Sequence, residues 1–381
     1  MIASLYVHVP FCLKKCDYCD FFSVTTKETD QFPVYLEALK AEIQDKKTRL
    51  RISRWGTVYV GGGTPSLLQP AHLDYLGKIL PKTEENTIEA NPEDITAEWL
   101  HACTANGFNR ISIGIQTLDD TSLSQIGRRG SKLRTLKSLE LLQQYWNGRI
   151  SVDLMTGLPG QTVQRLSHDI DVLVKQGISH FSVYSLTVEE GTPLARTIHT
   201  GKINLPDENT ADSLWISARD QLIASGFCQY EVSNFALPGF ESVHNLNYWE
   251  SGNWIGAGPA ASGTLRRGAE AVRETNTQDI QLWLEKPGQA HETEEITGIQ
   301  HIQEYIMMGM RLLRGISIPA FSERFSSEIM DLIPRTIATW RAKGYLVHSE
   351  DRLFLTSDGI LYLNRFLSDV IAELSDDEPG S

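Results

Sequence analysis

The chain has 381 residues, with 35 Lys and Arg against 48 Asp and Glu, which is a formal net charge of −13 at pH 7. With 41% hydrophobic residues it has enough apolar material for a large core, and this excludes disorder over most of its length. The acidic balance argues against strong nucleic-acid binding, and no apolar run approaches the ~20 residues that a membrane helix needs.

Six short β-rich runs alternate with helical patterns in the first half of the chain. The expected strands are Ser4–Val9, Thr57–Val60, Thr87–Ala90, Ile111–Ile115, Ile150–Leu154 and Phe181–Tyr184. Helical spacing of apolar residues predicts helices at Tyr35–Ile43, His72–Ile79, Leu133–Tyr145 and Leu166–Gln176. This alternation predicts βα units around a parallel sheet, either doubly wound or closed into an incomplete barrel.

The composition and periodicity of the sequence change after the last of these units. A helix is expected at Glu208–Ser225 and a strand at Gln229–Phe235. Residues 237–290 are rich in Gly, Asn, Trp and Ser with little periodicity, and we interpret them as a functional loop and linker. The first 236 residues would then form one α/β domain.

The C-terminal part, residues 291–374, shows helical patterns at Thr293–Leu313 and Ile333–Lys343 and a hairpin pattern over Tyr345–His348 and Leu353–Thr356. Helices followed by a hairpin indicate a small module of winged-helix type. Residues 291–381 hold 15 acidic and 8 basic side chains, a net charge of −7, so DNA binding is disfavoured. The tail, residues 375–381, is expected to be disordered.

Three of the five cysteines, Cys12, Cys16 and Cys19, lie within eight residues directly after the first expected strand. Three thiolates on one loop can hold three corners of a cubane cluster and leave the fourth iron without a protein ligand. A structural zinc site is the alternative, although zinc would need a fourth ligand. Cys103 and Cys228 stand apart and are expected to be ordinary packed thiols.

Other polar and glycine-rich positions follow the expected strands. Gly61–Pro65, with the sequence GGGTP, comes directly after Thr57–Val60, where glycines let a ligand approach the backbone. Glu89, Gln116, Arg128 and Asp153 also lie at or just beyond strand ends. Each could be a solvated residue or a strand cap. Together they suit a zwitterionic ligand with ribose hydroxyls, which would supply partners to buried acids.

The motifs YVHVPFC, CDYC, GGGTPS, IEANPE, RISIGIQT, GLPGQT, YEVSNFA and HNLNYW resemble the coproporphyrinogen III oxidase-like group of the radical S-adenosylmethionine (SAM) superfamily, which contains HemN oxidases and HemW haem chaperones. The resemblance runs from about Leu5 into the C-terminal module. It implies an incomplete (β/α)6 barrel of TIM type, followed by a small C-terminal helical module of winged-helix type.

The resemblance also implies the cofactors and their ligands. Cys12, Cys16 and Cys19 would bind a [4Fe–4S] cluster. The implied SAM-binding residues are Tyr6, Tyr18, Gly62, Gly63, Thr64, Glu89, Gln116, Arg128 and Asp153. Thr64 stands where many members of the superfamily have Glu.

Two departures separate the chain from the oxidases that it resembles. The oxidases have a fourth cysteine two positions after the third, where this chain has Phe21. They also have an N-terminal extension before the cluster loop, which we do not expect here because Tyr6 stands almost at the start of the sequence. The HNLNYW segment matches the chaperone branch, and His244, Tyr248 and Trp249 within it are candidates for haem contact because imidazole is a common haem ligand and rings pack on a macrocycle.

We therefore predict a haem chaperone that binds haem as cargo and transfers it to haem-requiring proteins. The alternatives are an oxygen-independent coproporphyrinogen III oxidase, a SAM- or redox-sensing cluster protein, and an RNA-modifying radical SAM enzyme that the net charge disfavours. The resemblance implies dimers and contact with acceptors that include membrane-bound respiratory components. The N-terminus lacks the basic region of a signal peptide, so we expect a cytoplasmic protein that reaches membranes only through its partners.

Overall fold

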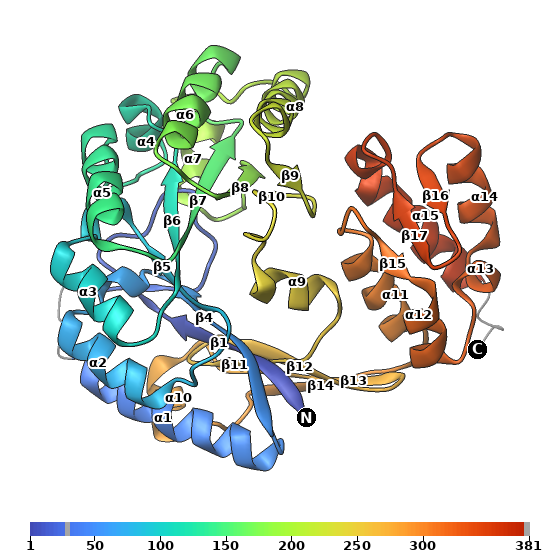
Figure 1. Ribbon diagram of the computed structural model, residues 1–381, viewed down its shortest axis with the longest axis horizontal. Helices are drawn as coiled ribbons and strands as arrows, with labels where there is room; N and C mark the ends of the chain where they lie inside the picture. Colours follow the sequence, from blue (N-terminus) through green and yellow to red (C-terminus); the bar gives the residue numbers. More distant parts are fainter. Residues whose placement is uncertain (27–30, 377–381) are drawn as a thin grey trace.

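The computed structural model describes residues 1–26 and 31–376. Its largest sheet has 12 strands in the order β14-β13-β12-β11-β1-β4-β5-β6-β7-β8-β10-β9. The strands β1, β4, β5, β6, β7 and β8 are parallel neighbours that curve into an incomplete barrel (Figure 1). They span Ile2–Val9, Arg54–Gly62, Asn86–Ala90, Arg110–Gln116, Arg149–Thr156 and His180–Ser185. The six predicted strands and the incomplete (β/α)6 barrel are confirmed.

Helices cover the outer face of the barrel (Figure 1). They are α1 (Gln31–Arg49), α2 (Pro70–Ile79), α3 (Ala97–Ala105), α5 (Lys132–Tyr145) and α6 (Val163–Lys175). The main core lies between these helices and outward strand residues such as Ile88, Ile111 and Val152. Side chains of Thr96 and Thr162 accept hydrogen bonds from the first turns of α3 and α6, which defines where these helices begin.

Shorter elements connect the barrel units. They are β2 (Phe11–Cys12), β3 (Val24–Thr25), η1 (Pro65–Leu67), η2 (Pro92–Asp94), α4 (Asp120–Gln125) and α7 (Pro193–His199). Helix α8 (Glu208–Ala224) follows β8 and packs against α6. In place of the single strand predicted at Gln229–Phe235, the chain forms two short antiparallel strands, β9 (Cys228–Gln229) and β10 (Asn234–Ala236).

Residues 237–290 differ from the expected loop and linker, because much of this segment is regular. It contains α9 (Val243–Trp249), β11 (Trp254–Ala257), β12 (Ser262–Arg267), β13 (Glu270–Thr275) and α10 (Ile280–Glu285). Strand β11 pairs in parallel with β1, and β12, β13 and β14 (Glu292–Ile296) continue the sheet as antiparallel strands. A Cβ on Gly263 would lie 2.6 Å from Gly256 N, so the close approach of β11 and β12 needs the glycines that had suggested a loop.

The C-terminal module has its own core, which includes Phe321, Trp340 and Phe366. Its helices are α11 (Gly298–Gly309), α12 (Ile318–Phe325), α13 (Ile329–Leu332), α14 (Pro334–Ala342) and α15 (Leu363–Asp376), with η3 (Gly359–Tyr362) before the last. Strands β15 (Ile316–Ser317), β17 (Arg352–Leu355) and β16 (Leu346–His348) form an antiparallel sheet that contains the predicted hairpin.

Two details of this region differ from prediction. The helix expected at Thr293–Leu313 is shorter, because Glu292–Ile296 pairs with β13 as strand β14. Helix α15 extends to Asp376, so the expected disorder of the tail concerns residues 377–381, which lie outside the described residues. In the parts of the chain that the structure describes, no helix is both long and apolar enough to cross a bilayer.

Candidate functional site

The interior of the barrel is polar, whereas an ordinary closed barrel is filled by Val, Ile and Leu. Strand side chains alternate in direction, so every second residue of β5 to β8 faces inward. Polar strand residues that line a central cavity of about 340 Å³ are Thr87, Glu89, Arg110, Ser112, Gln116, Ser151, Asp153, His180, Ser182 and Tyr184. A hollow barrel lined in this way is suited to hold a polar ligand.

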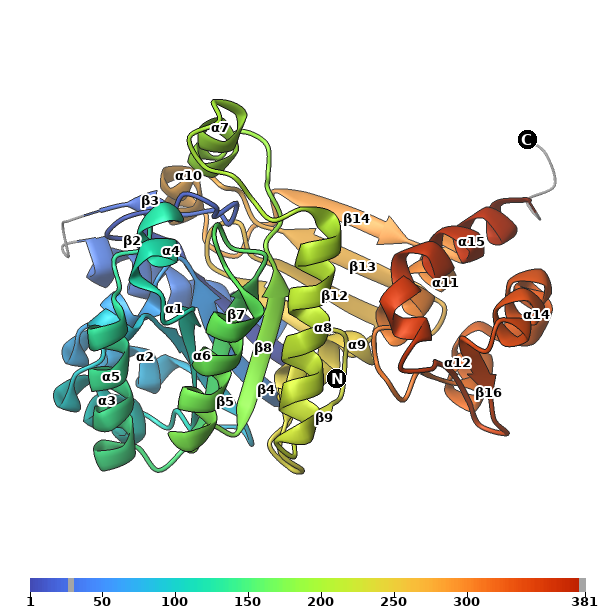
Figure 2. The ribbon, with the colours of Figure 1, turned by 90° about the horizontal axis from the view of Figure 1, so that it is seen from above.

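Cys12 ends the short strand β2, and Cys16 and Cys19 lie on the loop that connects β2 to β3. Strands β2 and β3 lie at the end of the barrel toward which the parallel strands point (Figure 2). Thr64 Oγ1 donates a hydrogen bond to Cys12 Sγ at 3.4 Å, and Arg128 Nη1 donates one to Cys16 Sγ at 3.6 Å. Both donors would stabilise thiolates. The structure therefore places two predicted SAM residues against the cysteine sulfurs.

This donor set fits a cubane cluster. Burial raises the pKa of the Cys19 thiol, and a bound cation would offset that cost by stabilising the thiolate. In residues 1–26 and 31–376, no three His, Cys, Asp or Glu side chains converge on a point that one metal ion could occupy. A cubane does not require such convergence, because each cysteine binds a different iron.

The glycine-rich loop after β4 packs directly against the cysteine loop. Gly62 has a φ of 111°, and a Cβ there would lie 2.8 Å from the His8 ring. A Cβ on Gly63 would lie 2.7 Å from the carbonyl oxygen of Phe11. His8 Nε2 lies 2.9 Å from the carbonyl oxygen of Phe22, so this buried histidine ties β1 to the cysteine loop. That supporting role was not predicted from the sequence.

Three further predicted SAM residues lie near the same end of the barrel. Tyr18 and Gln116 line the cavity, and Gln116 has a φ of 69° at a register irregularity that turns the end of β6. The Tyr6 hydroxyl lies 2.9 Å from His8 Nδ1. A polar ligand held above β6 and β7 would contact Tyr18 and Gln116 together.

Two predicted acids face the cavity. Glu89 accepts hydrogen bonds from the Tyr59 hydroxyl at 2.8 Å and from the Gly62 backbone N–H at 3.2 Å. Burial raises the pKa of Glu89 to about 7 and that of Asp153 to about 6. A cationic ligand would stabilise both ionised carboxylates, as expected for a pocket that binds the ammonium and sulfonium groups of SAM.

The raised pKa of Glu89 predicts how stability depends on pH. The folded state holds the Glu89 proton more tightly than the unfolded chain does, so the proton stabilises the fold. This contribution to the free energy of unfolding is fully present below about pH 4.5 and is lost as the pH rises through about 7. We expect Glu89→Gln to abolish this loss, which amounts to at most about 3 kcal/mol. Thermal unfolding of the SAM-free protein between pH 5 and pH 8 checks it, and parallel profiles for the two proteins would contradict it.

His244, predicted as a haem candidate, is buried in the short helix α9. Its Nδ1 lies 2.7 Å from Thr57 Oγ1 and its Nε2 lies 2.9 Å from the Tyr248 hydroxyl. The Thr57 hydroxyl donates to Ser4 Oγ, so it accepts from Nδ1 and leaves Nε2 to accept from Tyr248. Both nitrogens are engaged inside the protein, and burial lowers the pKa of His244 to about 3. In this structure neither ring nitrogen of His244 is free to bind haem iron, and its contact with haem stays a prediction.

The other two haem candidates face different surroundings. Tyr248 is held between His244 and the indole of Trp254, whose ring centroid is 4.9 Å away. Trp249 lies on the side of α9 toward the C-terminal module, with the Arg311 guanidinium 5.2 Å from its ring centroid. Only Trp249 therefore lies beside the space between the two lobes.

A buried ion pair beneath the cavity was missed in the sequence. Arg110 Nε donates to Glu85 Oε2 at 3.0 Å, and Glu85 also accepts from Ser242 Oγ and from the backbone N–H groups of Val243 and His244. This carboxylate fastens the start of α9 to the barrel. No local signal marks Glu85, because its partners lie up to 159 residues away.

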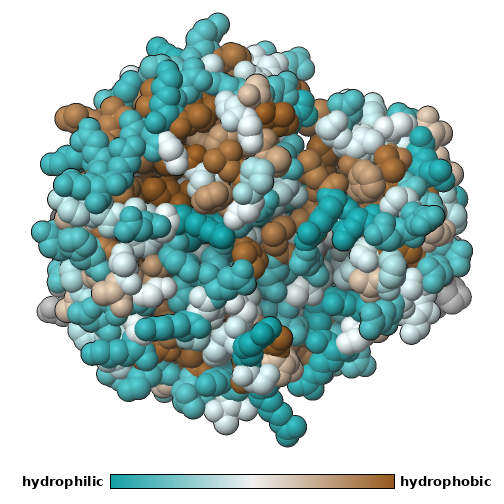
Figure 3. All heavy atoms as spheres, in the orientation of Figure 1, coloured by the Kyte–Doolittle hydropathy of each residue, from teal (hydrophilic) through white to brown (hydrophobic). Residues whose placement is uncertain are grey.

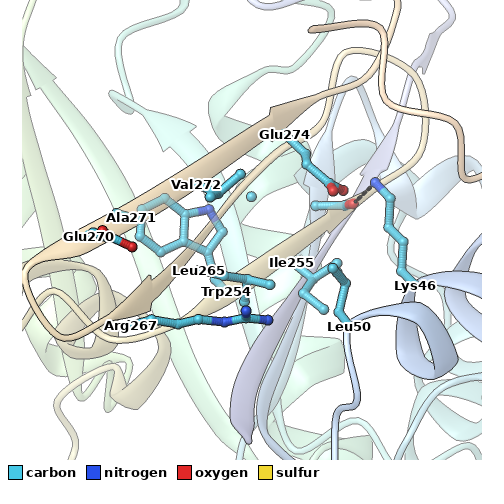
Figure 4. A pocket seen from close by; sticks show the side chains of 12 residues that line it. Lys46, Leu50, Trp254, Ile255, Leu265, Arg267, Glu270, Ala271, Val272 and Glu274 are labelled. Carbon is cyan, nitrogen blue, oxygen red and sulfur yellow. Dashed lines mark hydrogen bonds between the residues drawn. The ribbon is translucent and has the colours of Figure 1, made fainter. Parts of the chain in front are cut away.

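A second cavity of about 240 Å³ lies beside α1 and strands β11 to β13 (Figure 4). Leu265 and Val272 line it together with the charged residues Arg267 and Glu270, while Lys46 Nζ donates to the Gly256 carbonyl at its edge. None of the predicted site residues lines this cavity. Of the two remaining cysteines, Cys103 is buried as predicted, but Cys228 is exposed on β9, so the prediction of a packed thiol is wrong there.

Comparisons with known proteins agree with this site. Residues 6–173 match the Radical SAM superfamily, and residues 296–362 match the HemN C-terminal domain. The solved structure of coproporphyrinogen III oxidase (HemN) from Escherichia coli has a TM-score of 0.80 to this chain, covers 97% of it and 89% of the enzyme, and is 20% identical, which is evidence for the fold alone. The fold and the cysteine loop thus define a radical SAM protein.

Closer relatives extend over the whole chain. The heme chaperone HemW of Bacillus subtilis is 34% identical, and the alignment covers 97% of this chain and all of the relative. The mitochondrial radical S-adenosyl methionine domain-containing protein 1 of Danio rerio is 32% identical, with 98% and 87% covered. The chain belongs to the HemW family of radical SAM proteins. Membership implies a [4Fe–4S] cluster and SAM as its cofactors.

Proposed function

We propose that this protein is a haem chaperone, which binds haem and transfers it to haem-requiring acceptors. The observation that carries the proposal is the agreement over nearly the whole chain with relatives named heme chaperone HemW in several bacteria. The polar barrel and the buried acids support a SAM site, and the three cysteines support a cluster at the adjacent loop.

Different side chains at the cofactor site would serve the cluster and SAM. Cys12, Cys16 and Cys19 would hold the cluster, which when reduced supplies an electron that can cleave SAM to a deoxyadenosyl radical. Thr64 and Arg128 donate hydrogen bonds to the thiolate sulfurs. Glu89 and Asp153 would balance the positive charge of SAM, while Tyr18 and Gln116 would contact it from the cavity wall.

An oxygen-independent coproporphyrinogen III oxidase is the second candidate, because HemN shares the fold. Phe21 disfavours it. Its side chain is 72% exposed and lines the mouth of the barrel cavity, at the position of the fourth oxidase cysteine. A large exposed aromatic side chain at a cavity mouth is suited to contact with a partner or an apolar ligand.

The proposed setting follows from the family. Haem would pass to acceptors that include membrane-bound respiratory components, the protein would act in the cytoplasm, and two copies would form a dimer. Any membrane association would pass through the acceptor.

The proposal predicts haem uptake without oxidase activity. Under anaerobic conditions, reconstituted protein titrated with haem should develop a Soret band and retain it through gel filtration. With SAM and a reductant it should convert no coproporphyrinogen III to protoporphyrinogen IX, with HemN as the positive control.

Three outcomes separate the candidate functions. Haem retention alone supports the chaperone. Efficient decarboxylation would overturn it in favour of the oxidase. SAM binding without haem retention would leave a SAM-sensing cluster protein as the better explanation.

A further inference from the structure

A cleft of about 590 Å³ lies between the barrel and the C-terminal module. One wall comes from β8, α8 and the turn before β10, and the other from η3 and the start of α15. The residues that form it include Tyr184, Trp215, Ile216, Val232, Arg311, Ile360, Leu361 and Tyr362. Figure 3 shows apolar side chains gathered in the hollow between the two lobes.

Three exposed side chains of the cleft are large and mainly apolar, and they lie beside the exposed polar residues Ser185, Asp212 and Asn364. Tyr184, Leu361 and Tyr362 keep 43%, 40% and 50% of their surface exposed, although folding normally buries such groups. Rings and aliphatic groups on two facing walls form a slot for a flat apolar molecule, against which aromatic faces can pack. A porphyrin macrocycle has that shape and character.

One cation is available in the cleft. The Arg311 guanidinium lies over the Trp249 ring, and no carboxylate in residues 1–26 and 31–376 forms an ion pair with it, although the exposed Asp212 also lines the cleft. Glu231 is close enough for Arg311 to lower its pKa, but Glu231 accepts its hydrogen bonds from Ser233 N and Asn234 Nδ2. An arginine whose guanidinium lies over an indole and forms no ion pair is well placed to bind a propionate.

The cleft also adjoins the cofactor site. Tyr184 lines both the barrel cavity and the cleft, so this residue borders both spaces. A ligand in the cleft would therefore lie one side chain away from the space proposed for SAM.

From this geometry we propose that haem binds in the cleft, with its macrocycle between Tyr184 and η3 and a propionate on Arg311. The proposal rests on the proposed haem-chaperone function and names its site. The described residues that line the cleft include no His, Cys or Met, and in this proposal Tyr184 and Tyr362 pack on the macrocycle with their ring faces, so the iron keeps an open axial position. Weak axial ligation suits a protein that must release its cargo. The HNLNYW segment then acts through Trp249, which positions Arg311.

The test is a haem titration of the full-length protein, followed by the Soret band. Arg311→Glu should weaken binding about tenfold or more, since it replaces an attractive charge with a repulsive one. Leu361→Glu, a change at an exposed position on the opposite wall, should weaken it to a similar extent. Arg267→Glu is the matched control, because it makes the same charge change in the cavity of Figure 4. Haem dimethyl ester, which lacks propionate charge, should bind the wild type and Arg311→Glu alike.

The outcomes distinguish the site from the function. If the wild type retains no haem, the chaperone function itself fails. If it retains haem while Arg311→Glu and Leu361→Glu bind as tightly as the wild type, the cleft is excluded. If only Arg267→Glu loses haem binding, haem binds in the cavity beside α1 and not in the cleft. Imidazole should shift the Soret band of bound haem, and an unchanged band would show that the protein fills both axial positions, against the proposal.

Discussion

Cys16→Ala is expected to remove the iron–sulfur chromophore and any reductive cleavage of SAM. The Cys16 sulfur accepts from Arg128, and no other thiol in the described chain is placed to replace it, since Cys103 is buried in the core and Cys228 is exposed on β9. A cubane with only two protein thiolates loses iron readily, so we expect less than about one tenth of the wild-type absorbance. Anaerobic reconstitution followed by iron analysis and visible absorption measures it.

The matched control is Cys228→Ser, which changes an exposed thiol on β9 and should leave cluster content unchanged. Circular dichroism of both variants separates loss of the cluster from loss of the fold. Full cluster occupancy in Cys16→Ala would show that the three-cysteine assignment is wrong.

Arg128→Gln offers a finer readout of the same site. Arg128 also donates to Asn91 Oδ1 and to the Gly114 carbonyl, so it is fixed in place beside Cys16. This variant removes a positive charge beside a cluster sulfur, so it should change the reduction potential of the cluster. It should leave the three cysteine ligands in place. This distinguishes a residue that tunes the cluster from one that binds it.

The barrel could be predicted from sequence because its signals are local. Strands such as Ile111–Ile115 carry β-branched side chains outward, and the polar residues between them mark the hollow interior. The cysteine loop and the glycine-rich loop are also short continuous segments, so spacing and resemblance identified them.

The parts that could not be predicted depend on contacts between distant residues. Strands β11 and β12 contain glycines that lower strand propensity, and they form because β11 pairs with the edge of β1 about 250 residues earlier in the chain. His244 looked like a haem ligand within HNLNYW, but its Nδ1 partner is Thr57, 187 residues away. A motif shows which side chains are neighbours along the chain, and burial decides which of them a ligand can reach.

The buried network below the cavity leads to the second large expected effect. Glu85 and Arg110 are each about 1% exposed at the side chain and pair at 3.0 Å. Arg110 also donates to Ser151 Oγ and to the Phe240 and Glu241 carbonyls, so it connects β6 to β7 and to the segment before α9. Removing either charge leaves the other buried without its main partner.

Glu85→Ala should therefore lower the free energy of unfolding by about 3–5 kcal/mol, which is the cost of an uncompensated buried charge. Urea unfolding followed by fluorescence and by circular dichroism would measure it, with the neighbouring exposed Glu84→Ala as the control. The double variant Glu85→Leu/Arg110→Met should be less destabilised than Glu85→Ala, because no buried charge is left unpaired. If the loss of stability in the double variant equals the sum of the losses in the two single variants, the pair is not coupled.

Since Glu85 holds the first turn of α9, Glu85→Ala should also loosen the Trp249–Arg311 contact and weaken haem retention. The cluster at the opposite end of the barrel should stay intact.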